Sequence, residues 1–145
     1  MNRLIGILFF VLIGCAPIPH HRDVAPKIDG SITYDGTPQS NKTIVLSIDR
    51  KESCNDEDTK TITNRDGRFS IGPITKLFYM KFYLGDPYTS WKLCVKDNNR
   101  YKVIAQQNGT GFSLQKLNMK CELTKKSKSY LWPLHNLDSL CEVDE

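Results

Sequence analysis

Five cysteines carry the most distinctive chemistry in this sequence, and their positions separate one of them from the other four. Cys15 directly follows an apolar run, whereas Cys54, Cys94, Cys121 and Cys141 are spread through the rest of the chain. A thiolate is a nucleophile and a metal ligand, and two thiols form a disulfide in an oxidising compartment. The chemistry of these residues therefore depends on where the chain is delivered.

The N-terminal residues predict export. Arg3 precedes an apolar run from Leu4 to Ile13 that only Gly6 interrupts, which is the layout of a signal peptide. The run is too short to span a bilayer.

The end of this signal, Leu12-Ile13-Gly14-Cys15, resembles the lipobox of bacterial lipoproteins. The resemblance implies a diacylglycerol on the Cys15 sulfur, cleavage before Cys15, acylation of the freed amine, and so attachment to a membrane by acyl chains. Ala16 is not the Asp that favours the inner membrane, so the resemblance implies the periplasmic face of the outer membrane. The alternative is an ordinary leader that is cleaved near Ala16 or Ala25.

The other four cysteines predict two disulfides, because the bacterial periplasm oxidises paired thiols in small exported domains. Three connectivities remain open; Cys54–Cys94 with Cys121–Cys141 is favoured, since the second bridge would pin the C-terminal tail to the body. No Cys-x-x-Cys spacing exists, and the three histidines stand at 20, 21 and 135. We therefore expect no metal site and no cofactor.

Neither catalysis nor nucleic-acid binding is predicted. The sequence contains no Gly-x-Ser-x-Gly and no His-Glu-x-x-His motif, and no catalytic residue is proposed. The acidic residues Glu52 and 56–58 lack the alternation and the glycine of a calcium loop. A net charge of +4 is mild, and no arginine run is interleaved with aromatic residues.

Alternating hydrophobicity predicts an all-β domain. We expect a signal peptide at 1–14, a lipidated tether at 15–26, and one domain at 27–145. Within that domain, seven or eight short strands should form an antiparallel β-sandwich, against which an apolar C-terminal tail packs. The expected strands cover 28–34, 44–48, 59–63, 68–71, 77–84, 91–97, 101–107 and 112–123, and a helical turn is expected at 135–140.

Strand alternation also predicts which side chains face the core. Within 77–84, Phe78, Met80, Phe82 and Leu84 share one face and are expected in the core. Tyr79 and Tyr83 lie on the other face, where they are either exposed or covered by the tail. Trp91, Leu93 and Val95 should point inward, which leaves Cys94 on the opposite face.

Residues 27–75 resemble the carboxypeptidase-regulatory-like, or transthyretin-like, domain. The resemblance rests on three segments: Ile28-Asp29-Gly30-Ser31-Ile32, Tyr34-Asp35-Gly36-Thr37-Pro38, and 61–71 with its Asp66-Gly67 turn before Phe69 and Ile71. Asn64 stands where that family often has Asp, and either side chain can cap the turn. Only the strand pattern extends the resemblance over 76–123.

A rigid, tethered sandwich without catalytic groups predicts a binding protein. Exposed aromatic residues are the candidate contacts, namely Tyr79, Tyr83 and Tyr88, together with Trp91, which is expected in the core but could frame a site. In architecture the chain is similar to immunity lipoproteins of type VI secretion, which implies a toxin partner such as a secreted phospholipase. The alternatives are an accessory role in envelope or pilus assembly through strand addition, and carbohydrate binding.

Overall fold

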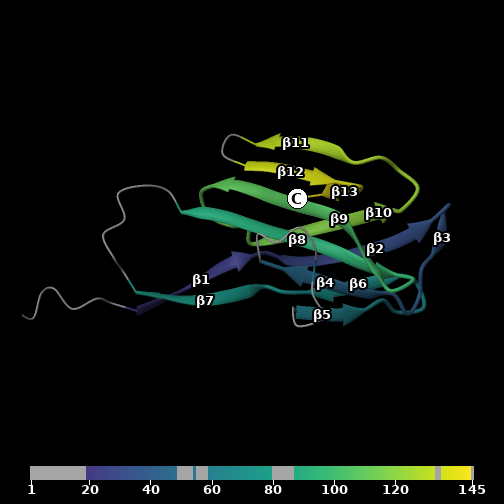
Figure 1. Ribbon diagram of the computed structural model, residues 1–145, viewed down its shortest axis with the longest axis horizontal. Coiled ribbons are helices and arrows are strands. Elements are labelled where there is room, and N and C mark those ends of the chain that lie inside the picture. The colour runs from purple at the N-terminus through teal and green to yellow at the C-terminus, as the bar shows by residue number, and fades with distance from the viewer. Residues whose placement is uncertain (1–18, 49–53, 55–58, 80–86, 133–134, 145) are drawn as a thin grey trace, which may run out of the picture.

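The computed structural model describes residues 19–48, 54, 59–79, 87–132 and 135–144, and these form two packed β-sheets with a projecting two-stranded ribbon (Figure 1). In sheet order, the five-stranded sheet contains β13 (Cys141–Asp144), β10 (Lys116–Glu122), β2 (Lys27–Tyr34) and β3 (Thr37–Pro38), with β6 (Arg68–Ile71) also paired to β2. The six-stranded sheet contains β11 (Lys128–Trp132), β12 (His135–Ser139), β9 (Arg100–Thr110), β8 (Tyr88–Asp97), β4 (Thr43–Ser47) and β5 (Thr59–Ile62). The ribbon pairs β1 (Pro19–Ala25) with β7 (Ile74–Tyr79).

Both sheets contribute to one apolar core, so the predicted all-β sandwich is confirmed. Ile28 and Ile32 of β2 are fully buried against the six-stranded sheet, whose Trp91, Leu93 and Val95 are fully buried as well. Alternation along each strand sends every second side chain into this layer. The predicted inward face of β8 is therefore confirmed.

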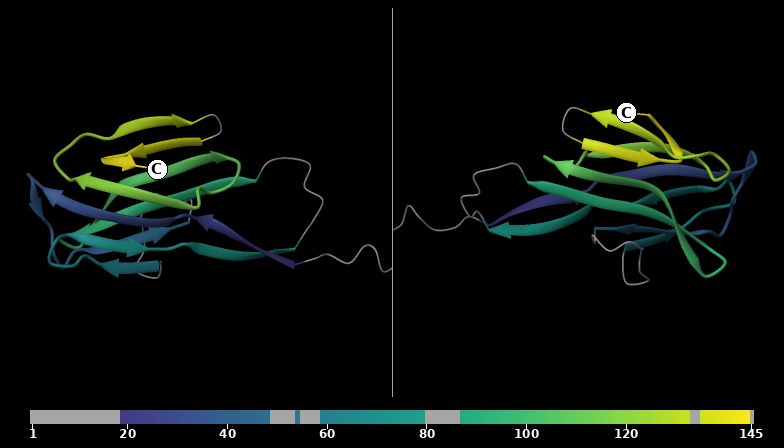
Figure 2. Two further views of the ribbon diagram at one scale, coloured as in Figure 1. Left: turned by 180° about the vertical axis from the view of Figure 1, so that it is seen from behind. Right: turned by 45° about the horizontal axis from the view of Figure 1, so that its top comes forward.

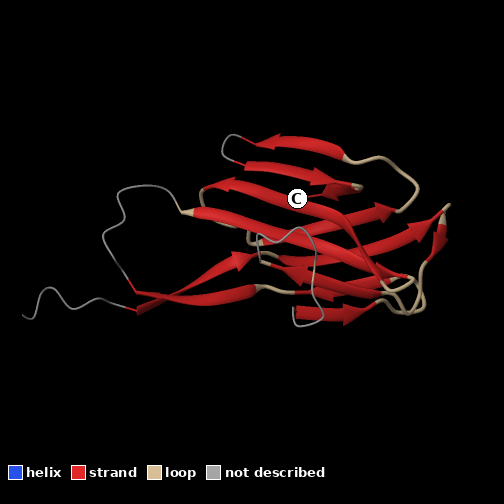
Figure 3. Cartoon of the chain, in the orientation of Figure 1, coloured by secondary structure: helices blue, strands red, loops and turns tan. Residues whose placement is uncertain are grey.

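The number and direction of the strands differ from the prediction. The described residues contain thirteen strands rather than seven or eight, because the expected tether and tail also pair as strands and Thr37–Pro38 forms a short strand beside β2 (Figure 3). The prediction of wholly antiparallel pairing is also wrong in one place, since β10 runs parallel to β2, with Leu117 opposite Ile28. Strand β10 begins only at Lys116, and the preceding Phe112 lies exposed in the connection from β9.

The turn before β6 forms as the Asp66-Gly67 sequence predicts. Asn64 Oδ1 accepts hydrogen bonds from the backbone N–H of Asp66 at 3.0 Å and of Arg68 at 2.9 Å. The amide therefore caps the turn in place of a carboxylate. Phe69, next on β6, lies directly over Gly30 of β2, where a Cβ atom would stand 2.7 Å from the phenyl ring. Gly30 thus lets the ring pack against the bare backbone.

The C-terminal tail belongs to both sheets. Strands β11 and β12 extend the six-stranded sheet, the chain crosses over at Leu140, and β13 pairs with β10 in the other sheet. Leu137 is fully buried, which confirms that the tail packs on the sandwich. The predicted helical turn at 135–140 is wrong, because β12 pairs with β9 throughout His135–Ser139.

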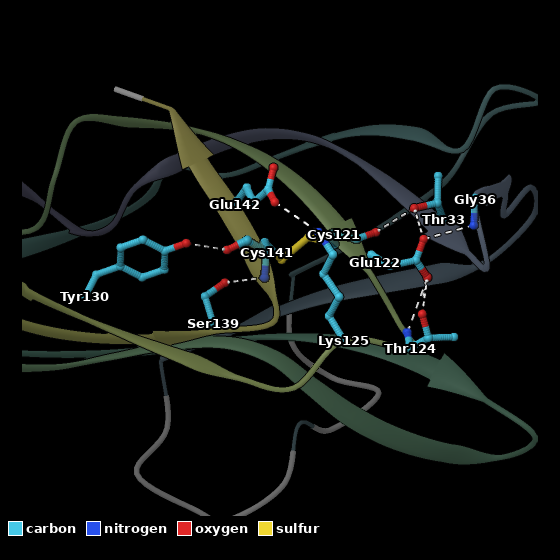
Figure 4. A network of polar contacts seen from close by, with 10 residues as sticks. All are labelled: Thr33, Gly36, Cys121, Glu122, Thr124, Lys125, Tyr130, Ser139, Cys141 and Glu142. Carbon is cyan, nitrogen blue, oxygen red and sulfur yellow. Dashed lines mark hydrogen bonds and ion pairs between the residues drawn. A yellow bond between two sulfur atoms is a disulfide. The ribbon is translucent and has the colours of Figure 1, made fainter.

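Both favoured disulfides are present. Cys121 of β10 and Cys141 of β13 form a bridge between directly opposed positions of neighbouring strands, which holds β13 at the sheet edge (Figure 4). Cys54–Cys94 lies on the outer face of the six-stranded sheet, where both sulfur-bearing residues are buried with Val45. The predicted outward direction of Cys94 is confirmed.

A carboxylate at the end of β10 fixes the turn between β2 and β3. Glu122 accepts hydrogen bonds from the Thr33 hydroxyl at 2.8 Å, from the Gly36 N–H at 3.0 Å and from the Thr124 hydroxyl at 2.9 Å (Figure 4). The Asp35 N–H donates a further bond at 2.9 Å. The hydrogen bonds from the Gly36 N–H, which has the largest effect, and from Thr33 and Thr124 lower the pKa of Glu122 to about 2.

Replacing Glu122 by Gln should lower the free energy of unfolding at pH 7 and make it less sensitive to acid. The folded-state pKa of about 2 lies below the ordinary value of 4.5, so the carboxylate stabilises the fold above pH 4.5 and loses this effect as the pH falls towards 2. In urea titrations between pH 7 and 2, the difference between wild type and Glu122→Gln should therefore close in acid. A difference that stays constant would contradict the assignment, and Asp144→Asn serves as an exposed carboxylate control on the neighbouring strand.

Candidate functional site

The ribbon of β1 and β7, here called the arm, is the feature that departs most from the sequence prediction. It extends beyond the two sheets, with Pro19 at its outer end (Figure 2). Pro19 pairs with Tyr79 there, and Ala25 pairs with Ile74 where the arm meets the body. The prediction of an irregular tether up to residue 26 is therefore wrong for 19–25, and Cys15 itself lies outside the described residues.

The arm continues the antiparallel ladder of β2 and β6. Ile28 of β2 pairs with Ile71 of β6. The pairing then stops and resumes between Ala25 of β1 and Ile74 of β7. At this break Gly72 has a φ of +77°, and a Cβ atom there would stand 2.5 Å from the Pro26 carbonyl oxygen. The backbone at Gly72 therefore lies against the backbone at Pro26, and a side chain at position 72 would push the two segments apart.

Strand alternation gives the arm two faces. His20 opposes Phe78 and Arg22 opposes Lys76, so these four side chains lie on one face, called the aromatic face. His21 opposes Leu77 on the other face, called the leucine face, which also carries a hydrogen bond from Thr75 Oγ1 to Asp23 Oδ1 at 2.6 Å. Leu77 is 48% exposed.

Arg22 joins the aromatic face to the body. Its guanidinium carbon lies 5.5 Å from the ring centre of Phe78 and 5.0 Å from that of Phe112, which reaches over from the connection after β9. His20 stacks at a tilt on Phe78, with 6.2 Å between ring centres. A planar cation between two aromatic faces is a favourable geometry, and it holds the arm against the sandwich.

Within the described residues, Arg22 makes few hydrogen bonds. Its Nη2 donates to Thr89 Oγ1 over a long 3.5 Å, and none of these residues supplies an acceptor to its buried Nε. Phe112 remains 68% exposed beside it. The terminal nitrogens of a guanidinium held beside an exposed ring can bind a carboxylate or carbonyl group of a partner.

The predicted binding residues are distributed differently from the expectation. Tyr88 is 51% exposed at the start of β8, next to Thr89, which accepts the hydrogen bond from Arg22. Trp91 is fully buried and its Nε1 donates to Gln107 Oε1 at 2.6 Å, so it belongs to the core and frames no surface site. Tyr79 ends β7, its backbone pairing with Pro19, while its side chain and Tyr83 lie outside the described residues.

The predicted core face of 77–84 is wrong where the structure describes it. Phe78 stands on the arm among His20 and Arg22 instead of in the core, because β7 pairs with β1 beyond the edge of the sandwich. Met80, Phe82 and Leu84 lie outside the described residues. The C-terminal tail does not cover β7, since it pairs with β9 and β10.

Sequence reasoning missed Arg22 and Phe112. No local pattern connects two residues ninety positions apart, because their contact depends on β1 and the β9 connection meeting at one end of the sandwich. Residues 19–25 show no alternation of apolar and polar side chains that would have indicated a strand, and three prolines nearby pointed to a linker.

The remaining described surface offers weaker candidates. One open depression of about 510 Å³ lies beside β5 and is lined by Thr43, Lys60, Thr61, Ile62 and Lys96. Another, of about 370 Å³, lies at the β8–β9 turn and is lined by Asp97, Asn98, Arg100, Tyr101 and Lys102. Among the described residues, no group of three His, Cys, Asp or Glu side chains could hold a metal ion. In that same part of the chain, no helix has the length and apolarity to cross a membrane.

Comparison with known proteins gives one family. A family model described as "Domain of unknown function (DUF6795)" matches residues 28–126, which run from β2 to the turn after β10. No curated protein and no solved structure matches the chain. The arm strand β1 and the tail strands lie outside the matched range, so the aromatic face combines family residues with residues of this chain's own N-terminal segment.

Replacing Arg22 by Ala should loosen the arm without unfolding the body. Losing two cation–π contacts should speed amide exchange in β1 and β7 about tenfold, which corresponds to roughly 1.4 kcal/mol. Hydrogen exchange followed by mass spectrometry measures this, and exchange in β2 and β8 should stay unchanged. Arg65→Ala, in an exposed turn, is the matched control. Unchanged exchange in the arm of Arg22→Ala would show that the stack does not hold it.

Proposed function

This chain belongs to the DUF6795 family, and we propose that it is a lipid-anchored protein that binds a protein partner at the bacterial envelope. The observation that carries the proposal is the aromatic face, where Arg22 lies between Phe78 and the exposed Phe112. Arg and aromatic side chains supply most of the energy at protein interfaces, above all where they are held rigid.

The body supports this surface as a rigid base. Two disulfides, Cys54–Cys94 and Cys121–Cys141, fix Cys54 and the C-terminal strand to the sheets. Thr89, which accepts the hydrogen bond from Arg22, is buried and donates in turn to the Gly111 carbonyl at 2.7 Å. A partner that contacts Arg22 and Phe112 therefore meets groups that lose little conformational entropy on binding.

The proposed anchor places this surface close to a membrane. Only three residues separate Cys15 from Pro19, the first residue of the arm. A fully extended chain of that length spans at most about 14 Å. With acyl chains on Cys15, the arm would stand at the membrane surface, and the proposed location is the periplasmic face of the outer membrane.

For the partner we propose a secreted toxin that acts at the membrane, such as a phospholipase, so that the protein would serve as a type VI secretion immunity lipoprotein. A lipase approaches its substrate at the bilayer surface, where the anchored aromatic face would meet it. One-to-one binding there would occlude the catalytic entrance of the toxin. This assignment builds on the architectural resemblance noted from the sequence.

One observation favours a second candidate, a structural role in envelope or pilus assembly through strand addition. Strand β5 is one of the two edge strands of the six-stranded sheet, and Thr59, Lys60 and Ile62 are exposed on it. An unpaired sheet edge can accept a strand from another protein. Its shortness, four residues, limits the length of any added ladder.

Capture experiments should recover the toxin with the acylated full-length protein as bait. Phe112→Ala and Arg22→Ala should each reduce recovery about tenfold or more, because truncating a central anchor costs about 2 kcal/mol. The control is Tyr34→Ala, which removes a 56% exposed aromatic side chain at the end of β2, away from the arm. Failure to recover any secreted enzyme, together with failure to protect cells against a toxin encoded beside the gene, would contradict the immunity role.

Lipidation is tested separately by metabolic labelling with an acyl probe. The wild-type chain should incorporate the probe and sediment with membranes, because two or more acyl chains make release slow. Cys15→Ser should abolish labelling and either release the domain or leave it unprocessed. Labelling that persists in Cys15→Ser would refute the anchor.

A further inference from the structure

We propose that the aromatic face accepts a carboxylate of the partner between Arg22 and Lys76, so that the segment of the toxin that contacts this face is acidic. The inference rests on the proposed function, because it names the chemistry of the partner at the same site. It adds Lys76 to the contact and selects a carboxylate over a neutral carbonyl group.

Two cations face each other across the arm. Arg22 of β1 pairs directly with Lys76 of β7, and opposed residues of an antiparallel pair place their Cβ atoms about 5 Å apart on the same face. Like charges in this position destabilise a β-ladder. The arm therefore carries a repulsion that a negative group placed between the two side chains would relieve.

The described residues supply no acid to this pair. No ion pair between them includes Arg22 or Lys76. The acid of β1, Asp23, lies on the leucine face, where it accepts a hydrogen bond from Thr75 Oγ1 at 2.6 Å. Within the described part of the chain, the aromatic face of the arm therefore carries positive charge alone.

The guanidinium of Arg22 is positioned to receive a carboxylate. Its carbon lies 5.5 Å from the ring centre of Phe78 and 5.0 Å from that of Phe112, so the group is held in place before a partner arrives. Its Nη2 donates one long hydrogen bond of 3.5 Å to Thr89 Oγ1, which leaves N–H donors on the terminal nitrogens for a partner. A neutral carbonyl group would bond to Arg22 but leave the repulsion from Lys76 in place, whereas a carboxylate removes it.

The position of the two cations favours a protein segment over a membrane surface. Arg22 lies midway between Pro19 at the outer end of the arm and Ala25 at the body, with its guanidinium between Phe78 and Phe112. A flat bilayer would meet the outer end of the arm first, whereas a single side chain can reach into this position. Phe112 is 68% exposed and can pack on an apolar neighbour of the carboxylate. The contacting segment should therefore combine Asp or Glu with an apolar residue.

Amide exchange of the toxin-free protein tests the repulsion. The acylated full-length protein is held in phosphatidylcholine nanodiscs, and exchange is measured on β1, whose own sequence is unchanged in the variants. Lys76→Glu should slow this exchange about two- to fivefold, because an opposite-charge pair with Arg22 replaces a like-charge pair. Lys76→Arg should leave it unchanged. Lys126→Glu, in the connection between β10 and β11, changes the net charge equally and is the matched control. Unchanged or faster exchange in Lys76→Glu overturns the inference.

Toxin capture with the same variants tests the contact itself. Lys76→Glu should lower recovery about tenfold or more, although its arm is better held, because it places a like charge beside the carboxylate of the partner. Lys76→Arg and Lys126→Glu should recover as much toxin as the wild type. Higher salt should weaken capture by the wild type more than capture by Lys76→Gln, since screening acts on the charge that the variant lacks. Recovery by Lys76→Glu that equals wild-type recovery overturns the inference.

The outcomes separate this inference from the proposed function. Capture that is lost in Phe112→Ala but kept in Lys76→Glu leaves the aromatic face as the binding surface and removes only the acidic contact. Failure of the wild type to capture any toxin overturns the proposed function and the inference with it. If phosphatidylglycerol nanodiscs slow exchange in wild-type β1 without toxin, and Lys76→Glu abolishes this effect, the occupant is a lipid headgroup and the acidic protein segment is refuted.

Discussion

The pairing of β2 with β6 is the interaction on which the rest of the structure depends. Strand β2 is central to its sheet, with β10 on one side and β6 and β3 on the other, and its Ile28 and Ile32 are fully buried. The same ladder continues past the contact of Gly72 with Pro26 into the arm. The arm therefore extends the line of the β2–β6 ladder beyond a break at Pro26 and Gly72 and a register shift between Asp23 and Ala25, and its direction follows from the core.

This continuity explains how a two-stranded ribbon can hold a defined surface. An isolated hairpin is marginally stable in water, but here the inner end is fixed by the buried Ala25 and the middle by the stacking of Arg22 on Phe112. The body that carries Phe112 is in turn stiffened by the Cys121–Cys141 bridge and by the Glu122 clamp on the β2–β3 turn. Remote bonds thus contribute to the precision of the proposed binding surface.

Local patterns predicted the parts of the fold that depend on nearby residues. The Asn64 turn, the inward set of Trp91, Leu93 and Val95, and the outward Cys94 follow from alternation and turn chemistry, both of which act over a few positions. The parallel pairing of β10 with β2 could not be predicted in this way, because partner choice between distant strands depends on the total burial of both sheets. The packing of the tail on the sandwich was predicted, but its division between the two sheets was not, because that division also depends on pairing between distant strands.

The sequence alone determined the all-β class, the inward faces of the central strands and the chemistry available to Cys15 and the four other cysteines, since these depend on residue type and local spacing. Only the tertiary structure decided that 19–25 forms a strand, that Phe78 leaves the core, and that Arg22 meets Phe112. The arm exists because β1 and β7 extend a ladder already formed by their neighbours. Such a contact gains its stability from long-range pairing, which no short stretch of sequence contains.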